Sequence, residues 1–147
     1  MSKYFVYFSL TGNGDYIASL YEEKGYTPVK VEMVKTPKKV GFFTILKYGG
    51  RAMTNKKEKL KEITLNLKED DEVIIGSPIW NDRLSTPINT ILDQYSFNKE
   101  TTLCVLYPAG EGTKKSLKQI EKLGFKKTPI VITYPLKNKE QTRDKIK

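Results

Sequence analysis

The sequence predicts an α/β fold in which helices cover both faces of a parallel sheet. Three observations support this prediction: strand-like and helix-like segments alternate along the chain, two strand segments are continuous apolar runs, and glycine-bearing turns join strands to helices. Alternating strands and helices form parallel sheets with right-handed crossovers. The chain has 147 residues, the length of one ordinary domain, so we expect a single domain over residues 1–147.

Five segments are predicted as strands. The first is rich in aromatic and β-branched residues, and the second alternates apolar with charged residues. The third and fourth are unbroken apolar runs, as in parallel strands that are covered on both faces. The fifth is the β-branched run IVITY. In chain order the predicted strands are Lys3–Phe8, Pro28–Val34, Glu72–Gly76, Thr101–Tyr107 and Ile130–Tyr134.

Capping residues and apolar spacing mark the helices between these strands. The first helix has apolar residues at helical spacing and ends before Gly25. The third begins with Thr86 as N-cap and Pro87 at its first position, and the fourth is closed by Gly124. The weakest helix pattern lies within residues 37–61, whose apolar residues would cover the sheet or, alternatively, touch a membrane or a partner. The other predicted helices are Asp15–Lys24, Thr86–Tyr95, Thr113–Leu123 and a short one in the lysine-rich tail.

The composition excludes several kinds of chemistry. The chain has no His, so it lacks the usual general acid–base residue and any Ser-His-Asp or Cys-His nucleophile. Its one cysteine, Cys104, lies in a predicted buried strand, where we expect simple core packing. The chain has no apolar run of about 18 residues and no secretory signal pattern, so we expect no transmembrane segment and a cytoplasmic location.

The net charge of +9 is distributed unevenly. Residues 35–68 and 101–147 carry net charges of +8 and +7, whereas residues 69–100 carry −5. Such an excess of positive charge is compatible with a polyanion, an acidic membrane surface or an acidic protein as partner. Lysine-rich blocks are most often plain solvated faces, and the sequence leaves both explanations open.

Three turns follow predicted strands at the sheet edge where parallel α/β proteins bind their ligands. The first turn, Ser9–Gly14, has two hydroxyl side chains, two glycines that permit close backbone approach, and a helix N-terminus behind it. These features together suit an anion. The turn has no Lys or Arg, which favours a monoester phosphate held by neutral donors. A plain helix cap with a glycine-rich turn is the alternative.

The second turn carries the only tryptophan, Trp80, in the middle of the predicted loop 76–87. A tryptophan in a loop stacks on a planar ligand or packs back on the domain. The third turn, Tyr107–Thr113, contains two glycines and has a tight connection as its simplest explanation. Because all three turns meet at one edge of one sheet, we expect them to form a single ligand site.

These turns resemble those of the flavodoxin family. YFSLTGNG resembles the flavodoxin phosphate loop, [ST]-x-T-G-N-T, and EVIIGSPIWNDRLSTPINTIL resembles the second flavin loop of short flavodoxins, where an aromatic residue follows G-[ST]-P. The glycine turn after LCVLY resembles the third loop. The resemblance covers nearly the whole chain. It implies a flavodoxin-like three-layer α-β-α sandwich with a five-stranded parallel sheet, strand order 2-1-3-4-5, and one noncovalently bound FMN.

The resemblance also implies roles for individual residues. The implied phosphate loop consists of Ser9, Leu10, Thr11, Gly12, Asn13 and Gly14. The isoalloxazine ring would be held by Ser77, Pro78, Ile79, Trp80 and Asn81, with Tyr107, Ala109 and Gly110 along its other side. Two positions depart from the family pattern: Gly14 stands where a Thr is usual, and Asp15 follows it, where a carboxylate would compete with the phosphate or cap the helix. Asn81 is the residue of the second loop best able to adopt a positive φ.

The function hypothesis is an FMN-binding redox protein, either an electron carrier or a small FMN-dependent oxidoreductase, and whether it is an enzyme stays open. Its partner would be a redox protein or a small-molecule electron donor or acceptor, and the positive charge favours an acidic one. Neither nucleic acid nor a metal is expected. The alternative is a flavodoxin-like fold without flavin, whose basic face binds a polyanion or an acidic protein.

Overall fold

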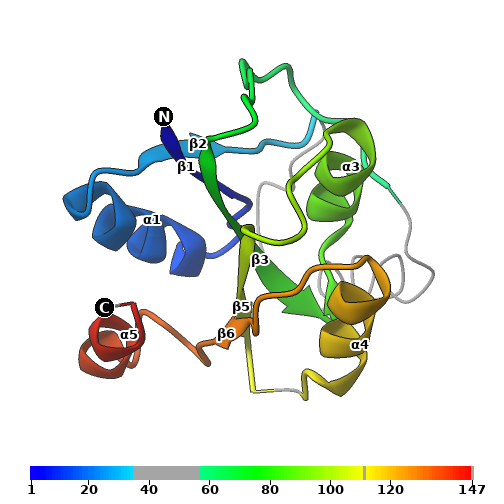
Figure 1. Ribbon diagram of the computed structural model, residues 1–147. Helices are drawn as coiled ribbons and strands as arrows, with labels where there is room; N and C mark the ends of the chain where they lie inside the picture. Colours follow the sequence, from blue (N-terminus) through cyan, green and yellow to red (C-terminus); the bar gives the residue numbers. More distant parts are fainter. Residues whose placement is uncertain (35–56, 111, 147) are drawn as a thin grey trace.

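A twisted parallel sheet forms the centre of the molecule. The computed structural model describes residues 1–34, 57–110 and 112–146. The parallel strands are β1 (Lys3–Tyr7), β2 (Thr27–Lys30), β3 (Glu72–Trp80), β5 (Leu103–Pro108) and β6 (Ile130–Val131). They lie side by side in the order β2-β1-β3-β5-β6 (Figure 1). This confirms the predicted sheet of five parallel strands, with the first strand between the second and the third.

Within the described residues, two helices pack on each face of the sheet, so the fold has three layers (Figure 1). The helices are α1 (Asn13–Glu23), α3 (Thr86–Gln94), α4 (Lys114–Lys122) and α5 (Lys139–Lys145). α1 and α5 lie on one face, and α3 and α4 lie on the other. The longest of them has 11 residues, and none of the helices in the described part of the chain is long and apolar enough to cross a membrane.

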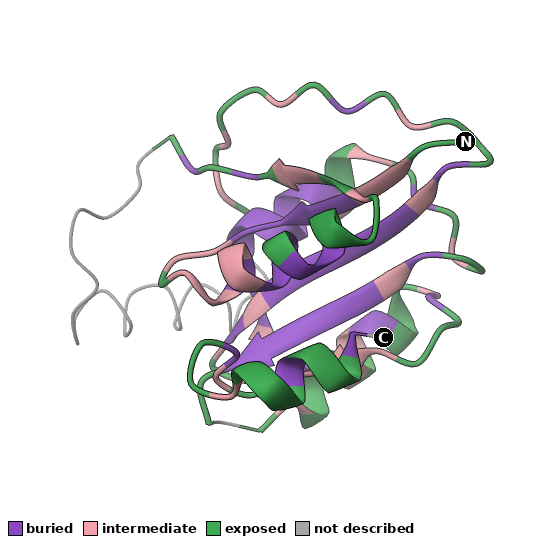
Figure 2. Ribbon diagram, turned by 90° about the vertical axis from the view of Figure 1, so that its left-hand side faces the viewer, coloured by how far each residue is buried: buried purple, intermediate pink, exposed green. Residues whose placement is uncertain are grey.

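Each face of the sheet has its own hydrophobic core, because successive strand side chains point to opposite faces. The core under α1 and α5 includes Phe5, Tyr7, Ile17, Ile74 and Ile146. The core under α3 and α4 includes Val6, Phe8, Ile75, Ile88 and Ile120. The central strands are buried along most of their length (Figure 2). Cys104 is buried in β5 as expected, and burial raises the pKa of its thiol to about 12, so the thiol stays protonated.

The third strand is longer than predicted and ends in a hairpin. β3 continues through Trp80, turns at Asn81 and Asp82, and returns as the short antiparallel strand β4 (Arg83–Leu84). Both turn residues have positive φ, 52° and 60°, as a type I′ hairpin turn requires. The prediction that Trp80 lies in the middle of a loop was therefore wrong, and the expected positive φ at Asn81 is confirmed.

Other element boundaries differ from prediction by a few residues. β2 ends at Lys30, and beyond it Met33 forms an isolated antiparallel bridge with Leu60. β6 is reduced to two residues. Ser85, one residue before the predicted Thr86, is the N-cap of α3. Residues 57–61 are not helical, and the rest of the weak helix prediction over residues 37–61 lies outside the described residues.

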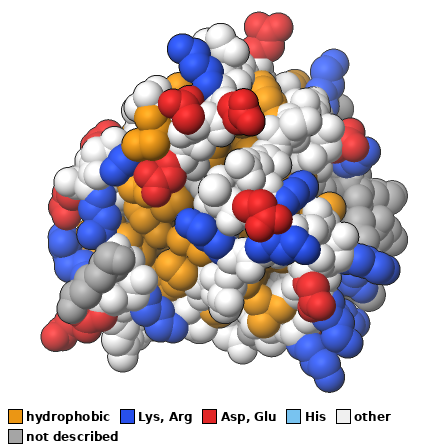
Figure 3. Space-filling view, viewed as in Figure 1, with side chains coloured by type: hydrophobic (Ala, Val, Ile, Leu, Met, Phe, Trp, Pro, Cys, Tyr) orange, Lys and Arg blue, Asp and Glu red, His pale blue; other side chains and the backbone are white. Residues whose placement is uncertain are grey.

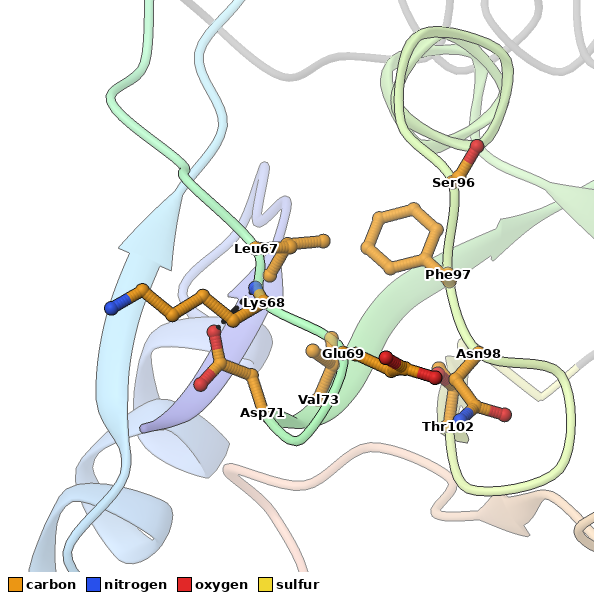
Figure 4. A pocket seen from close by; sticks show the side chains of 9 residues that line it. All are labelled: Leu67, Lys68, Glu69, Asp71, Val73, Ser96, Phe97, Asn98 and Thr102. Carbon is orange, nitrogen blue, oxygen red and sulfur yellow. Dashed lines mark hydrogen bonds between the residues drawn. The ribbon is translucent and has the colours of Figure 1, made fainter. Parts of the chain in front are cut away.

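A pocket of about 270 Å³ lies at the amino ends of β3 and β5, opposite to the edge of the three turns (Figure 4). Its lining includes the carboxylate of Asp71, a residue that is 7% exposed. The Asp71 carboxylate accepts hydrogen bonds from the backbone N–H groups of Ser2 and Lys68, both at 2.8 Å. These two bonds lower the pKa of Asp71. The pocket therefore contains a structural carboxylate that ties the chain start to the turn before β3.

We predict that Asp71→Asn lowers the free energy of unfolding at neutral pH. In the variant, this free energy should also depend less on pH in the acid range. A carboxyl whose pKa is lowered on folding stabilises the native state fully above its unfolded pKa, about 3.9. That stabilisation is lost as the pH falls through the lowered native value. The free energy of unfolding, measured by urea denaturation between pH 7 and pH 2.5, should thus fall less steeply below about pH 4 in the variant than in the parent chain. Asp70→Asn, at the exposed neighbour, is the control, and an equal effect of both substitutions would contradict the assignment.

Candidate functional site

The first turn curls over the N-terminus of α1. The Ser9 hydroxyl oxygen accepts hydrogen bonds from the backbone N–H groups of Gly12 at 3.1 Å and Gly14 at 3.0 Å. Gly12 is the N-cap of α1 with φ +93° and has no side chain to bond the first-turn amides. Because the Ser9 oxygen accepts twice, its own proton is available to point away from the turn. The turn thus gathers a hydroxyl and the amides of a helix N-terminus, the donors that bind anions.

The negative charge of the Asp15 carboxylate is compensated by neighbouring residues. It accepts a hydrogen bond from the Tyr7 hydroxyl at 2.9 Å and forms an ion pair with Lys30 at 2.9 Å. Burial and the neighbouring Asp15 raise the pKa of Tyr7, so its hydroxyl remains a donor. Asp15 makes no capping bond at the start of α1. Of the two roles considered for this residue, capping is therefore wrong, and competition with an anion is reduced by its pairing with Lys30.

Gly14 has no room for a side chain. A Cβ atom there would lie 2.7 Å from the Tyr107 hydroxyl oxygen, 2.9 Å from the Ser9 Cβ and 3.0 Å from the Phe8 carbonyl oxygen. The Tyr107 hydroxyl occupies this space because it donates a hydrogen bond to the Phe8 carbonyl. The glycine at the position where flavodoxins usually have a Thr therefore has a local cause, since a buried tyrosine from β5 supports the turn at this position.

The second turn presents Trp80 beside the first. The indole of Trp80 is half-buried and meets the ring of Phe8 edge-on, with centroids 5.7 Å apart and an interplanar angle of 90°. Below it, the fully buried Ser77 hydroxyl bonds the hydroxyl and the backbone N–H of Ser85, at 3.0 and 3.1 Å. The Asp82 carboxylate accepts from the Lys115 backbone N–H at the start of α4, at 3.2 Å. The tryptophan is thus held by a braced hairpin.

A fourth segment, which the sequence pattern did not single out, lies against the first and third turns. After β6 the chain turns at Tyr134, which has φ 46° and donates from its hydroxyl to the Ala109 carbonyl at 2.9 Å. The backbone N–H of Leu136 donates to the Asn13 side-chain oxygen at 3.1 Å. The Tyr134 ring also lies against Gly110, which has φ +86°. The signal was available, because the segment PLKN follows the last strand at the same sheet edge as the other three turns.

The structure divides the predicted site residues into two groups. The residues at least partly accessible at the loop edge are Ser9, Leu10, Thr11, Gly12, Asn13, Pro78, Trp80, Asn81, Ala109 and Gly110. The buried ones are Gly14, Ser77, Ile79 and Tyr107. The side chains of Ser77, Ile79 and Tyr107 are 3% exposed or less and support the turns from within the core, and their place around a ring stays a prediction. Within the described ranges, no group of three or more acidic, Cys or His side chains could hold a metal.

We predict that Gly14→Ala destabilises the chain by about 1–3 kcal/mol, the usual cost of overpacking. An alanine at this helical position would gain at most about 1 kcal/mol from helix propensity, so the clash outweighs the gain. The free energy of unfolding from chemical denaturation measures the effect. Gly112→Ala is the matched control, because a Cβ there meets nothing within 4 Å. A Gly14→Ala chain more stable than the parent would refute this packing.

Comparisons with known proteins agree with the fold. A scan against protein-family models and a search of curated proteins give no match. Among solved structures, the chain is similar to a flavoprotein in complex with FMN from Lactobacillus acidophilus NCFM, with 22% identity, 90% of each chain covered and a TM-score of 0.66.

Two further structures are putative flavoproteins. The one from Bacteroides uniformis is 18% identical, with 99% of this chain and 97% of that chain covered and a TM-score of 0.73. The one from Bacteroides eggerthii is 17% identical, with 97% and 94% covered and a TM-score of 0.70. At these identities the similarity establishes the architecture alone: the chain has a flavodoxin-like α/β fold.

Proposed function

We propose that this chain binds one FMN noncovalently at the loop edge of the sheet and acts as a redox protein. The main support for the proposal is that the first turn and Trp80 lie next to each other, because the ring of Phe8, which precedes the turn, contacts the Trp80 indole. A phosphate site and a planar aromatic surface side by side suit a phosphorylated planar ligand. The similarity in fold to a flavoprotein in complex with FMN supports this choice of ligand.

The first turn fits a phosphate monoester. Ser9, Thr11 and the backbone N–H groups of the turn that do not donate to Ser9 would hold it, and they are neutral donors at the positive end of the α1 dipole. The positive φ of Gly12 lets the backbone approach an anion without a side chain in between. The Lys30 partner of Asp15 reduces the repulsion that this carboxylate would otherwise exert on a phosphate.

The second and third turns fit the flavin ring. Trp80 and Pro78 would flank it from the hairpin, and Ala109 and Gly110 from the opposite turn, since these residues are accessible at the same edge. When bound, FMN supplies one- and two-electron chemistry, while the chain binds, orients and shields it. The Asn81 backbone, with φ 52°, is already in the region that allows its peptide to turn either way. The alternative of a flavin-free basic module is not favoured, because these turns combine the features that both parts of FMN need.

The first experiment is a titration of the flavin-free chain with FMN, FAD and riboflavin, followed by flavin fluorescence. We expect binding of one FMN per chain, weaker binding of riboflavin because it has no phosphate, and no tighter binding of FAD. Preferential binding of FAD, or equal binding of riboflavin and FMN, would reject the proposed phosphate site.

We predict that Trp80→Ala weakens FMN binding by about 1–3 kcal/mol, the contribution of an aromatic ring stacked on a planar heterocycle. It should also relieve quenching of flavin fluorescence by the indole. The same titration measures both effects, with Tyr95→Leu as an aromatic control on the far end of α3. Unchanged affinity together with unchanged quenching would mean that Trp80 only packs on Phe8.

A further inference from the structure

A basic groove lies between the hairpin and helix α4. It has a volume of about 650 Å³, and its lining residues are Arg83, Lys115, Lys118, Gln119, Glu121 and Lys122. Four of these side chains are cationic and only Glu121 is acidic. Figure 3 shows Lys and Arg side chains gathered over the α4 side of the molecule, at the lower right. We refer to these six residues as the basic groove.

The cations of the basic groove have no ion-pair partner in the described part of the fold. None of Arg83, Lys115, Lys118 and Lys122 forms an ion pair with a described residue, whereas Lys30 and Lys61 do. The Arg83 Nε atom is buried and has no hydrogen-bond partner among the described residues. A buried donor without a partner is costly, so hydrogen bonding within the described part of the chain does not explain the placement of Arg83.

The lysines near the start of α4 also oppose its stability, whereas Lys122 in the last turn favours it. Lys115, Lys118 and Lys122 are spaced by three and four residues, so they lie on one face of the helix and repel one another. The first turn of α4 has no acidic residue, and lysines there face the positive end of the helix dipole. The lysines of the first turn are therefore better explained by binding to an external anion than by the stability of the helix.

The basic groove is joined rigidly to the turn that carries Trp80. Asp82 binds the start of α4 through the Lys115 backbone N–H. The Gln119 side chain accepts from the Leu84 N–H at 3.2 Å and donates to Asn89 of α3 at 3.1 Å. Arg83 itself pairs with Trp80 in the hairpin register. A molecule docked in the groove would therefore lie next to the hairpin proposed to flank the flavin.

We propose that the basic groove docks a row of carboxylates on the surface of the protein that exchanges electrons with this chain, an inference that rests on the proposed function. Three lysines along one helix face match an extended or helical acidic segment. Among the described residues, the lining has no aromatic side chain on which a base would stack, which disfavours a nucleotide or nucleic acid. Positive charge beside the redox site would also steer an acidic partner into a productive orientation.

The first test measures binding of a fluorescein-labelled decaglutamate peptide by anisotropy at low salt. The test variant is Lys118→Glu/Lys122→Glu. The control variant is Lys126→Glu/Lys127→Glu, which changes the net charge equally at exposed positions outside the groove. We expect about a tenfold loss of affinity in the groove variant and less than about a twofold loss in the control. Equal losses in both variants, or tighter binding of a dT10 oligonucleotide than of the peptide, would overturn the proposal.

The second test uses the FMN-loaded chain and a reduced, acidic [2Fe–2S] ferredoxin, which passes one electron to the flavin in a stopped-flow instrument. We expect the second-order rate constant at low salt to fall about tenfold in the groove variant and to stay near the parent value in the control. Equal rate constants in all three chains would overturn the docking role. FMN affinity is titrated separately for each chain, so a failure to bind FMN would reject the proposed function while the peptide result still decides whether the groove binds carboxylates.

Discussion

The hydrogen bond from the Tyr107 hydroxyl to the Phe8 carbonyl is the constraint on which the loop edge depends. It joins the ends of β1 and β5, which flank β3 in the sheet. The hydroxyl fills the space above Gly14 and so determines how tightly the first turn wraps onto α1. Burial raises the pKa of Tyr107 far above its ordinary value, with smaller contributions from Tyr7 and Asp15, so the hydroxyl remains a donor throughout the neutral range.

The electrostatics of the molecule are divided between two neighbouring regions. At the first turn the charges cancel, because Lys30 pairs with Asp15 and the donors toward the open side are neutral. Around α4 the charges add, because four cations line one groove with a single carboxylate. A neutral, dipolar turn suits a small anion that is held in place. A concentrated positive surface acts over a longer range and suits the encounter with a larger partner.

The hairpin of β3 and β4 connects these two regions. Its two turn residues, Asn81 and Asp82, both take positive φ, and this tight reversal places Trp80 at the loop edge and Arg83 in the groove. Ser77 and Ser85 bind each other beneath it, and Asp82 and Leu84 attach it to α4. A change in the backbone of the turn would therefore move residues both at the proposed flavin site and at the proposed docking surface.

Sequence pattern alone predicts the α/β class, the buried parallel strands and the turns at positive φ, because these follow from apolar periodicity and from residues such as Gly25 and Gly124 that act locally. The strand order came from a family resemblance. Which of the predicted site residues are accessible, and which are buried beneath the turns, depends on packing between distant segments. Tyr107 reaches Phe8 across 99 positions, and Leu136 reaches Asn13 across 123. No local pattern encodes such contacts, since they arise only when the sheet brings distant turns to one edge.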